Sequence, residues 1–363
     1  MELVNFIKEH SDWREVLSKK PYSIKIKDDG PYTLFMYNQI ESDFYNPIVK
    51  ECRGVILDIS GEEPRVVCRA FDKFGNYGEG YADEIDWESA RVQEKVDGSI
   101  MKLWFDNGKW HVSTNSCIDA FKANLSNTNL NFGSLFTQVF PTELLVEMDQ
   151  DYTYIFELVS PYNRVVINYG KTAIYSLGKR NNLTGEEVDV EDLGLPRPDS
   201  YPLSSLEDCI EAAAALNDMD SEEVNYEGFV VVDKFYHRIK IKSPLYVSKH
   251  HVLTKTPSLT DLVIVYLRNE TEEFLTYFPN YWHALNLIYF YFSDLNYYLF
   301  KARLEWSAMG EDRKEFALAH KGDPFSRFYF DAIKYEDWSI ERVKALPHEE
   351  LARIIKNYYG DNI

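Results

Sequence analysis

The hydrophobic pattern of this chain changes near residue 246, and that change limits the folds it can adopt. Before it, apolar and polar residues alternate, as over 22–27, which is the two-residue period of a β-strand. After it, apolar residues recur every three or four positions, as over 282–306, which is typical of amphipathic helices. The length of 363 residues also exceeds the size of most single cores. We therefore predict two domains, an α+β domain over 1–246 and an all-α domain over 247–363.

Turn signals organise the first region into antiparallel pairs. Asp-Asp-Gly-Pro at 28–31 and Asp-Asn-Gly at 106–108 each separate two runs of strand character. Further strands are predicted at 54–59, 65–70, 154–159, 165–169, 173–177, 229–233 and 238–241, and helices at 3–17, 132–148 and 206–216. An acidic stretch with three prolines at 183–202 predicts a surface loop. In the second region, helices are predicted at 258–274, 282–306, 313–319 and 340–359.

Composition argues against several classes of protein. A formal net charge of −20 does not suit a protein that coats nucleic acid non-specifically, although it leaves room for a local basic groove. The four cysteines show no Cys-x-x-Cys spacing, which argues against a zinc ribbon and favours a reducing, cytoplasmic setting. The chain opens without the features of a secretory signal. The richest apolar run, 284–292, is too short to span a bilayer, so no membrane association is expected.

The segment Glu-Lys-Val-Asp-Gly-Ser-Ile at 94–100 contains a candidate nucleophile. Lys95 lies beside Asp97 and Gly98, between two runs of strand character. A lysine amine, with a pKa of about 10.4, must lose a proton before it attacks, and nearby cations or burial favour that loss. The Lys-x-Asp-Gly pattern alone should occur by chance in roughly one chain in ten of this length. Its meaning therefore depends on partners elsewhere in the chain.

Lys240 and Lys242 are the first of those partners. Alternate residues of a strand point to the same side, so the two ammonium groups share a face and can grip consecutive phosphates. An alternative interpretation is a solvated strand edge, where lysine prevents aggregation. Arg53 and Lys73 each lie near a glycine at a strand boundary, and taken singly both are ordinary surface positions.

Two carboxylates lie at strand positions where an apolar residue is expected. Glu157 is within Ile-Phe-Glu-Leu at 155–158, and Glu227 precedes Gly-Phe-Val-Val-Val at 228–232. Acids placed in this way indicate contacts with a metal or a ribose. The alternative for Glu157 is an outward position on a half-exposed strand.

Taken in order, these segments resemble motifs of the nucleotidyltransferase superfamily of ATP-dependent ligases and RNA capping enzymes. Within it, the closest resemblance is to the RNA ligase 1 family of T-even bacteriophages. The similar segments are Glu-Cys-Arg-Gly at 51–54, Lys-Phe at 73–74, Lys-Val-Asp-Gly-Ser at 95–99, Phe-Glu-Leu-Val-Ser-Pro-Tyr-Asn-Arg at 156–164, Glu-Gly-Phe-Val-Val at 227–231 and Lys-Ile-Lys-Ser at 240–243. An ordered set over roughly 30–250 is far more specific than any single motif.

The resemblance implies an ATP-grasp-like nucleotidyltransferase domain of mixed, mainly antiparallel sheets with flanking helices, followed by a helical domain that helps to select the RNA. It also implies a three-step ligation. Lys95 takes AMP from ATP and releases pyrophosphate; AMP passes to an RNA 5′-phosphate; an RNA 3′-hydroxyl then displaces AMP. The implied partners are RNA ends such as those of nicked tRNA, and a polynucleotide kinase/phosphatase acting upstream. The implied setting is the cytoplasm, that of the host if the chain is phage-encoded.

The same resemblance implies roles for the cations. Lys240 and Lys242 would clamp the α-phosphate of ATP. Arg53 and Lys73 would reach the β- and γ-phosphates or the RNA phosphate.

It also implies roles for the remaining site residues. Glu157 would bind the ribose hydroxyls, and Glu227 would hold the water shell of Mg²⁺. Glu157 is a second candidate metal contact, and Mn²⁺ is an alternative ion. The other expected nucleotide contacts are Asp97, Gly98, Gly228 and Tyr246.

Two positions depart from the family pattern. Asn115, in Thr-Asn-Ser-Cys at 114–117, stands where the family often has Lys or Arg, so one phosphate-binding cation is missing. Gly75 stands where an aromatic residue is common. In the helical region we expect the aromatics at 289–292, 297, 298 and 300 to be mainly core, because the interleaved Lys and Arg of a base-stacking surface are sparse.

Three rival functions stay open. A DNA ligase or a capping guanylyltransferase would continue after the Lys-x-Lys motif into a β-rich OB-fold, which the helical pattern after residue 246 does not resemble. A non-catalytic nucleotide- or RNA-binding module would be expected to have lost Lys95, Lys240 or Lys242, and all three are present.

Overall fold

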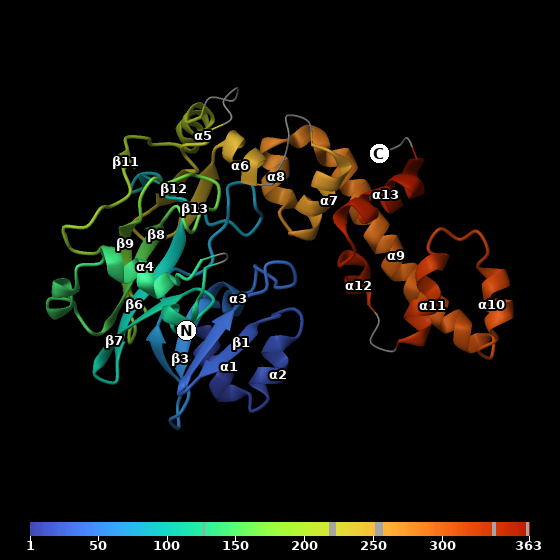
Figure 1. Ribbon diagram of the computed structural model, residues 1–363, viewed down its shortest axis with the longest axis horizontal. Coiled ribbons are helices and arrows are strands. Elements are labelled where there is room, and N and C mark those ends of the chain that lie inside the picture. The colour runs from blue at the N-terminus through green and yellow to red at the C-terminus, as the bar shows by residue number, and fades with distance from the viewer. Residues whose placement is uncertain (126–127, 218–222, 251–256, 336–338, 361–362) are drawn as a thin grey trace. The chain divides into compact units, whose positions relative to one another are not determined.

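The computed structural model describes residues 1–125, 128–217, 223–250, 257–335, 339–360 and 363 (Figure 1). The chain divides into two compact units, Met1–His250 and His251–Ile363. The first consists of antiparallel sheets with short helices, and the described part of the second is helical. The α+β class and the helical C-terminal region predicted from the change of pattern are confirmed.

The described strands of the first unit form three antiparallel sheets. The first has the order β1-β2-β3-β4, with β1 at Lys25–Asp29, β2 at Tyr32–Met36, β3 at Arg53–Asp58 and β4 at Arg65–Cys68. The second has the order β10-β9-β8-β6-β7, with β6 at Ser99–Asp106, β7 at Lys109–Thr114, β8 at Tyr152–Val159, β9 at Ala173–Asn181 and β10 at Glu187–Val188. The third has the order β11-β5-β12-β13, with β5 at Arg91–Glu94, β11 at Ser200–Tyr201, β12 at Gly228–Val232 and β13 at Arg238–Lys242.

Short helices accompany these sheets, and helices of 5 to 27 residues make up the described part of the second unit. Those of the first unit are α1 (Glu2–Glu9), α2 (Trp13–Ser18), α3 (Pro47–Glu51), α4 (Phe132–Val139), α5 (Leu206–Ala215) and α6 (Pro244–His250). Those of the second are α7 (Leu259–Leu267), α8 (Thr271–Tyr277), α9 (Trp282–Ala308), α10 (Arg313–Ala319), α11 (Ser326–Lys334), α12 (Ile340–Lys344) and α13 (His348–Tyr359). Among the described helices, none has the length and hydrophobicity that crossing a membrane requires.

Local chemistry explains where the predicted elements hold and where they do not. Asn107 and Gly108 both have positive φ, 50° and 78°, as a tight turn requires, and they join β6 to β7 as predicted. The helix predicted over 132–148 ends early because the residue before Pro141 is driven out of the helical region. The strand predicted over 165–169 is wrong. The N–H groups of Val166 and Ile167 donate to a carboxylate in place of a neighbouring strand.

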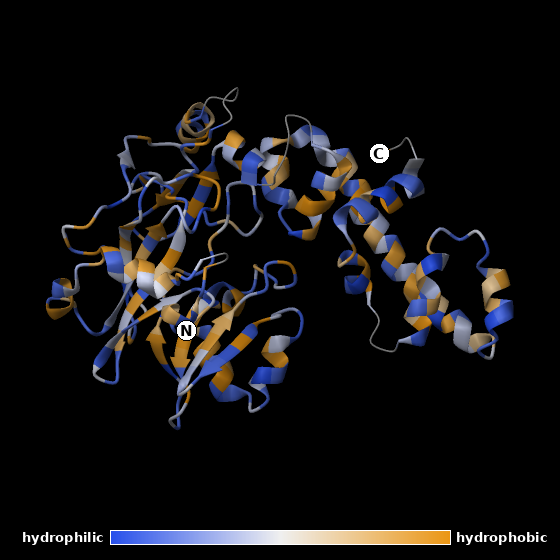
Figure 2. Ribbon diagram, in the orientation of Figure 1, coloured by the Kyte–Doolittle hydropathy of each residue, from blue (hydrophilic) through white to orange (hydrophobic). Residues whose placement is uncertain are grey.

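The aromatic residues of α9 divide between core and surface. Tyr291 and Phe292 are buried, as expected. Tyr289, Phe290, Tyr297 and Phe300 are 53–63% exposed, so the expectation that these aromatics belong to the core is wrong for these four. Neighbouring residues of a helix are about 100° apart around its axis, and a run such as 289–292 cannot all face one side. Hydrophobic and hydrophilic residues are accordingly mixed along the helices of the second unit (Figure 2).

Candidate active site

Strand pairing brings the lysine segment beside two segments from much later in the chain. Lys95 directly follows β5, whose Glu94 lies opposite Phe229 of β12. The N–H of Lys95 donates to the carbonyl of Gly228 at 2.8 Å. Gly228 in turn lies opposite Lys242 of β13. The register of one sheet therefore fixes the lysine, Gly-Phe-Val and Lys-x-Lys segments side by side.

Two carboxylates also lie near Lys95: Glu157, through a second strand pairing, and Glu227, which directly precedes β12. β6 begins at Ser99, near the end of the lysine segment, and pairs with β8, which places Ile100 opposite Glu157. The ammonium of Lys95 lies 2.8 Å from a carboxylate oxygen of Glu227. The Lys95 side chain is 21% exposed and that of Glu227 is 4% exposed, so this ion pair is largely enclosed by protein.

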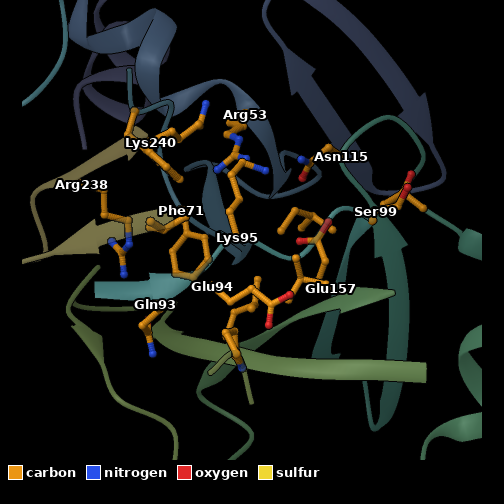
Figure 3. Close-up of a pocket in the computed structure, with 18 of the residues that line it drawn as sticks. Arg53, Phe71, Gln93, Glu94, Lys95, Ser99, Asn115, Glu157, Arg238 and Lys240 are labelled. Atoms are coloured by element: carbon orange, nitrogen blue, oxygen red, sulfur yellow. The ribbon is translucent and has the colours of Figure 1, made fainter. Parts of the chain in front are cut away.

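A cavity of about 400 Å³ lies beside Lys95 (Figure 3). That volume is in the range of small-molecule sites. Of the predicted site residues, those that line it are Arg53, Lys95, Gly98, Glu157 and Lys240. Those that do not line it are Lys73, Asp97, Glu227, Gly228, Lys242 and Tyr246. Its apolar lining includes Phe71, Phe74, Ile100, Leu177 and Val230. The cavity thus combines charged groups with a hydrophobic wall.

The charges of the site perturb one another. Burial raises the pKa of Glu157 to about 8, against the opposing effect of Lys95, and the nearby Glu227 raises it further. Burial also raises the pKa of Glu227, again opposed by Lys95. Enclosure by protein holds the pKa of Lys240 well below its usual range, and surrounding cations lower it further; these are Lys73, Arg53, Lys242 and Lys95. Such a concentration of positive charge suits a polyphosphate.

Lys73 is held by aromatic rings. Its side chain is buried, and its ammonium lies 4.8 Å from the ring centre of Phe44, 5.6 Å from that of Tyr37 and 5.7 Å from that of Tyr81. It forms no ion pair with any residue that the structure describes. Ring faces attract a cation without neutralising its charge. This aromatic cage therefore fixes Lys73 and leaves its charge available to an anion.

Asp97 makes its contacts within the protein. One oxygen accepts the N–H groups of Val166 and Ile167, at 2.9 and 2.8 Å, and the other accepts the hydroxyl of Tyr246 at 2.8 Å. Both Asp97 and Tyr246 are buried. We propose that these two residues position the lysine segment, residues 94–100; their direct contacts with a nucleotide stay a prediction.

The two glycines of the predicted site meet protein atoms. A Cβ on Gly98 would lie 2.4 Å from the carbonyl oxygen of Leu158, and one on Gly228 would lie 2.1 Å from that of Ile241. Gly228 also has a φ of 146°, which L side chains rarely adopt. Close packing of the strands is thus one reason for glycine at both positions, and the close approach of a nucleotide stays a prediction.

The structure shows the surroundings of Asn115 and Gly75, the two positions that depart from the family pattern. Asn115 lines the cavity, as the missing cation would, and its side-chain oxygen is buried without a hydrogen-bond partner in the described structure. A Cβ on Gly75 would lie 2.8 Å from the Cα of Ala82, so this backbone leaves no room for an aromatic side chain.

Sequence reasoning missed Arg238, which also lines the cavity. Its guanidinium lies 4.3 Å from the ring centre of Phe71 and forms an ion pair with Glu187. It therefore packs against Phe71, which is part of the apolar wall of the cavity. The signal was present, because residues 238, 240 and 242 alternate along one strand and share a face.

The carboxylates fit a divalent cation only together with other ligands. Among the described residues, no group of three or more His, Cys, Asp or Glu side chains is arranged to hold a metal. Mg²⁺, however, keeps several waters and often takes one or two carboxylates plus substrate phosphates. Glu157 and Glu227 are two such carboxylates, buried and close enough to disfavour each other's charge. A cation bound with a nucleotide would relieve that repulsion.

Comparison with known proteins places these features in a family. The family model for RNA ligases matches residues 51–246, which is more than half of the chain. The putative bifunctional polynucleotide kinase/RNA ligase of Autographa californica nuclear polyhedrosis virus is 32% identical over 284 residues. That match covers 71% of this chain but 39% of the viral protein, so the chain spans well under half of that relative.

Two further proteins are similar over most of their length. The RNA ligase of Rhodothermus phage RM378 is 27% identical over 322 residues, covering 72% of this chain and 73% of that protein. The solved structure of an archaeal ATP-dependent RNA ligase is 14% identical, with a TM-score of 0.49 over 76% of this chain and 77% of that one. With the family model matched over residues 51–246, the region that contains Lys95 and its strand-paired partners, this chain belongs to the RNA ligase family.

Proposed function

We propose that this protein is an ATP-dependent ligase that joins RNA 5′-phosphate and 3′-hydroxyl ends through a covalent lysyl-AMP intermediate. The observation that supports it most is the position of Lys95, which lines a cavity of nucleotide size while paired with the buried Glu227. Membership of the RNA ligase family and the cation cluster around Lys240 support it further.

In the first step, the Lys95 amine attacks the α-phosphorus of ATP. The N–P bond forms as the bond from that phosphorus to pyrophosphate breaks, and the electron pair leaves with pyrophosphate. The carboxylate of Glu227, 2.8 Å away and with a raised pKa, is placed to take the proton of the amine. Arg53 and Lys240 line the cavity where the phosphates would lie, and Lys73 and Lys242 add charge behind them. They offset the negative charge that develops on the phosphates.

The later steps use the same charges. AMP passes from Lys95 to the 5′-phosphate of an RNA, and the 3′-hydroxyl of a second end then attacks that phosphate and releases AMP. Mg²⁺, with Mn²⁺ as an alternative, would be held through its water shell by Glu157 and Glu227 and would offset phosphate charge.

We propose repair of broken RNA, such as tRNA nicked in its anticodon loop, as the setting of this reaction. The name of the baculovirus relative includes both a polynucleotide kinase and an RNA ligase, which supports an end-processing enzyme as the upstream partner. The helical region after residue 246 is proposed to select the RNA, and the host cytoplasm to be the site of action.

One assay separates this proposal from its rivals. The protein is incubated with α-labelled ATP and Mg²⁺, denatured and analysed for bound label, and then supplied with 5′-phosphorylated RNA or DNA. We expect a labelled protein and joined RNA. Labelling from GTP alone would favour a capping enzyme, efficient joining of DNA would favour a DNA ligase, and an unlabelled protein would indicate a non-catalytic module.

Asn115→Lys is expected to lower the Michaelis constant for ATP severalfold without abolishing ligation. It restores a cation at a position that lines the cavity. Asn115→Gln, which is neutral, is the matched control and should not improve ATP use. Lys122 is 61% exposed and paired with Asp29, so it is not expected to supply this charge. An unchanged Michaelis constant in Asn115→Lys would mean that Lys73 already fills the role.

Phe44→Leu is expected to raise the Michaelis constant for ATP about three- to tenfold, the range of a cation–π contact. The substitution keeps an apolar side chain but removes the ring nearest to Lys73. AMP affinity should stay unchanged, because Lys73 is assigned to the outer phosphates. Phe44→Tyr restores a ring and should restore ATP use. Equal losses of ATP and AMP affinity would instead indicate a general disturbance of the cavity.

A further inference from the structure

The connection between β8 and β9, residues 160–172, is long for two strands that pair directly. Antiparallel neighbours are usually joined by two to five residues, and longer loops in compact domains commonly have a function. The base of this β8–β9 loop is closed by a 2.9 Å hydrogen bond between the hydroxyls of Ser160 and Thr172. Its extra length is therefore an ordered projection from the sheet that carries Glu157.

The β8–β9 loop is fastened to the lysine segment at three points. The side chain of Asn163 donates to the hydroxyl of Ser99 at 2.8 Å, and Ser99 lines the cavity. Val166 and Ile167 donate to Asp97, as described above. The N–H of Asp97 donates to the hydroxyl of Tyr169 at 3.1 Å. These bonds hold the loop beside the lysine segment, next to Ser99, which lines the cavity.

Between these anchors, the loop presents a set of exposed side chains. Tyr162 is 55% exposed and Val165 is 47% exposed, while Arg164 and Lys171 are also exposed. The Nε of Arg164 donates to the carbonyl of Val166 at 3.0 Å, which orients the guanidinium. Neither Arg164 nor Lys171 has a carboxylate partner in the part of the chain that the structure describes.

The local charge is opposite to that of the whole chain. The 28 residues from 158 to 185 contain no Asp or Glu, although the chain has 59 of them and a formal net charge of −20. Of the four cations in this stretch, Lys179 and Arg180 are paired with carboxylates, so the unpaired charge is concentrated in the β8–β9 loop. An acid-free loop with an exposed aromatic ring and two unpaired cations matches the chemistry of single-stranded nucleic acid binding, where bases stack and phosphates pair.

We propose that the β8–β9 loop binds the RNA strand whose 5′-phosphate receives AMP, with Arg164 and Lys171 on the RNA phosphates and Tyr162 stacked on a base. The inference rests on the proposed function, because it specifies which surface brings the RNA to Lys95. Fastening the loop to Ser99 and Asp97 gives the bound strand a fixed position relative to the lysine. The function of the loop is thus to bind and position RNA, and no chemical step is assigned to it.

The direct test measures RNA binding in the absence of ATP. A fluorescent, 5′-phosphorylated single-stranded RNA is titrated with the full-length protein at several salt concentrations. The double variant Arg164→Gln/Lys171→Gln should bind about tenfold more weakly, and the slope of log Kd against log salt should fall by roughly 0.7 for each RNA phosphate that the variant no longer binds. Tyr162→Leu should bind at least about fivefold more weakly at every salt concentration, whereas Tyr162→Phe should bind as the wild type does.

Lys109→Gln is the matched control. Lys109 is exposed in the β6–β7 hairpin, and it lies opposite Asp106 at the other end of β6 from Ser99, roughly 23 Å away at 3.3 Å per residue. This variant should bind RNA as the wild type does.

A second readout separates this proposal from the proposed function. Labelling of Lys95 by α-labelled ATP should be unchanged in all loop variants, while transfer of AMP from the protein to RNA should fall with RNA affinity. Unchanged RNA binding in the double variant would overturn the proposal. So would an equal loss of Lys95 labelling, since the loop would then act through the nucleotide site. If RNA binding is weakened in the loop variants but the wild-type protein takes no label, the proposal for the loop would be supported and the proposed ligase function would be contradicted.

Discussion

Lys95→Ala is expected to abolish covalent labelling of the protein by α-labelled ATP. The wild-type label should survive denaturation and be released by acid, as expected for a phosphorus–nitrogen bond. The variant has no amine at the position that lines the cavity and pairs with Glu227 at 2.8 Å. Loss of the attacking group removes the first step entirely, so the residual signal should be the background of the assay.

Two controls show whether the loss of labelling comes from the missing amine or from a general disturbance of the protein. Lys109→Ala removes an exposed lysine from the start of β7, opposite the end of β6 that is far from Ser99, and should label normally. Lys95→Ala supplied with RNA that already has a 5′-adenylate should still join it to a 3′-hydroxyl, because the last step does not use the amine. Persistent labelling of Lys95→Ala would contradict the assignment and would direct attention to Lys240, the neighbouring lysine whose pKa is lowered.

Lys240→Met is expected to lower the rate of protein adenylation by about 10²–10³, the usual cost of removing a preorganised charge from a developing anion. Lys240 lines the cavity and is surrounded by four other cations. The variant removes one positive charge where the α-phosphate would lie. It should leave Lys95 and Glu227 paired, so labelling should be slow but not absent. Lys109→Met is the control and should label at the wild-type rate.

The same substitution should not destabilise the protein near neutral pH. The pKa of Lys240 is lowered in the folded state, so between that pKa and the unfolded value of about 10.4 the folded chain binds fewer protons than the unfolded chain. This lysine therefore costs stability at low pH, and the cost decreases as pH rises through the folded pKa toward the unfolded one. The Lys240→Met variant has no ammonium to bury, so its folded state does not carry this loss of stability. It should be at least as stable as the wild type at pH 7, with the difference shrinking toward pH 10.

Denaturant unfolding at several pH values measures that stability. A Lys240→Met variant that is both inactive and clearly less stable at pH 7 would indicate a structural role for this lysine and would remove it from the phosphate site. If the variant keeps its stability but adenylates much more slowly, the positive charge of Lys240 serves the reaction and does not stabilise the fold.

Much of the candidate site follows from the order of residues. The spacing of Lys240 and Lys242 sets them on one strand face, and their place after a Glu-Gly-Phe-Val-Val run allows the β12–β13 pairing that brings them to Lys95. The same reasoning missed the aromatic cage of Lys73, whose rings come from residues 37, 44 and 81. None of these positions has a local pattern that marks it, because the cage exists only when separate segments pack together.

The sequence by itself determined the α+β and helical regions and the hairpin turn at Asn107-Gly108, and it singled out a lysine and the cationic and acidic residues that the fold brings near it. These depend on periodicity, on backbone preferences and on residue chemistry, all of which are local. Only the tertiary structure decided that Asp97 bonds to Tyr246 and the β8–β9 loop, that close packing of strands is one reason for Gly98 and Gly228, and that one side of α9 is exposed. Those outcomes depend on which buried polar groups form hydrogen bonds with one another and on which faces of the strands and helices pack together. Such contacts join residues far apart in the chain, and no local pattern encodes them.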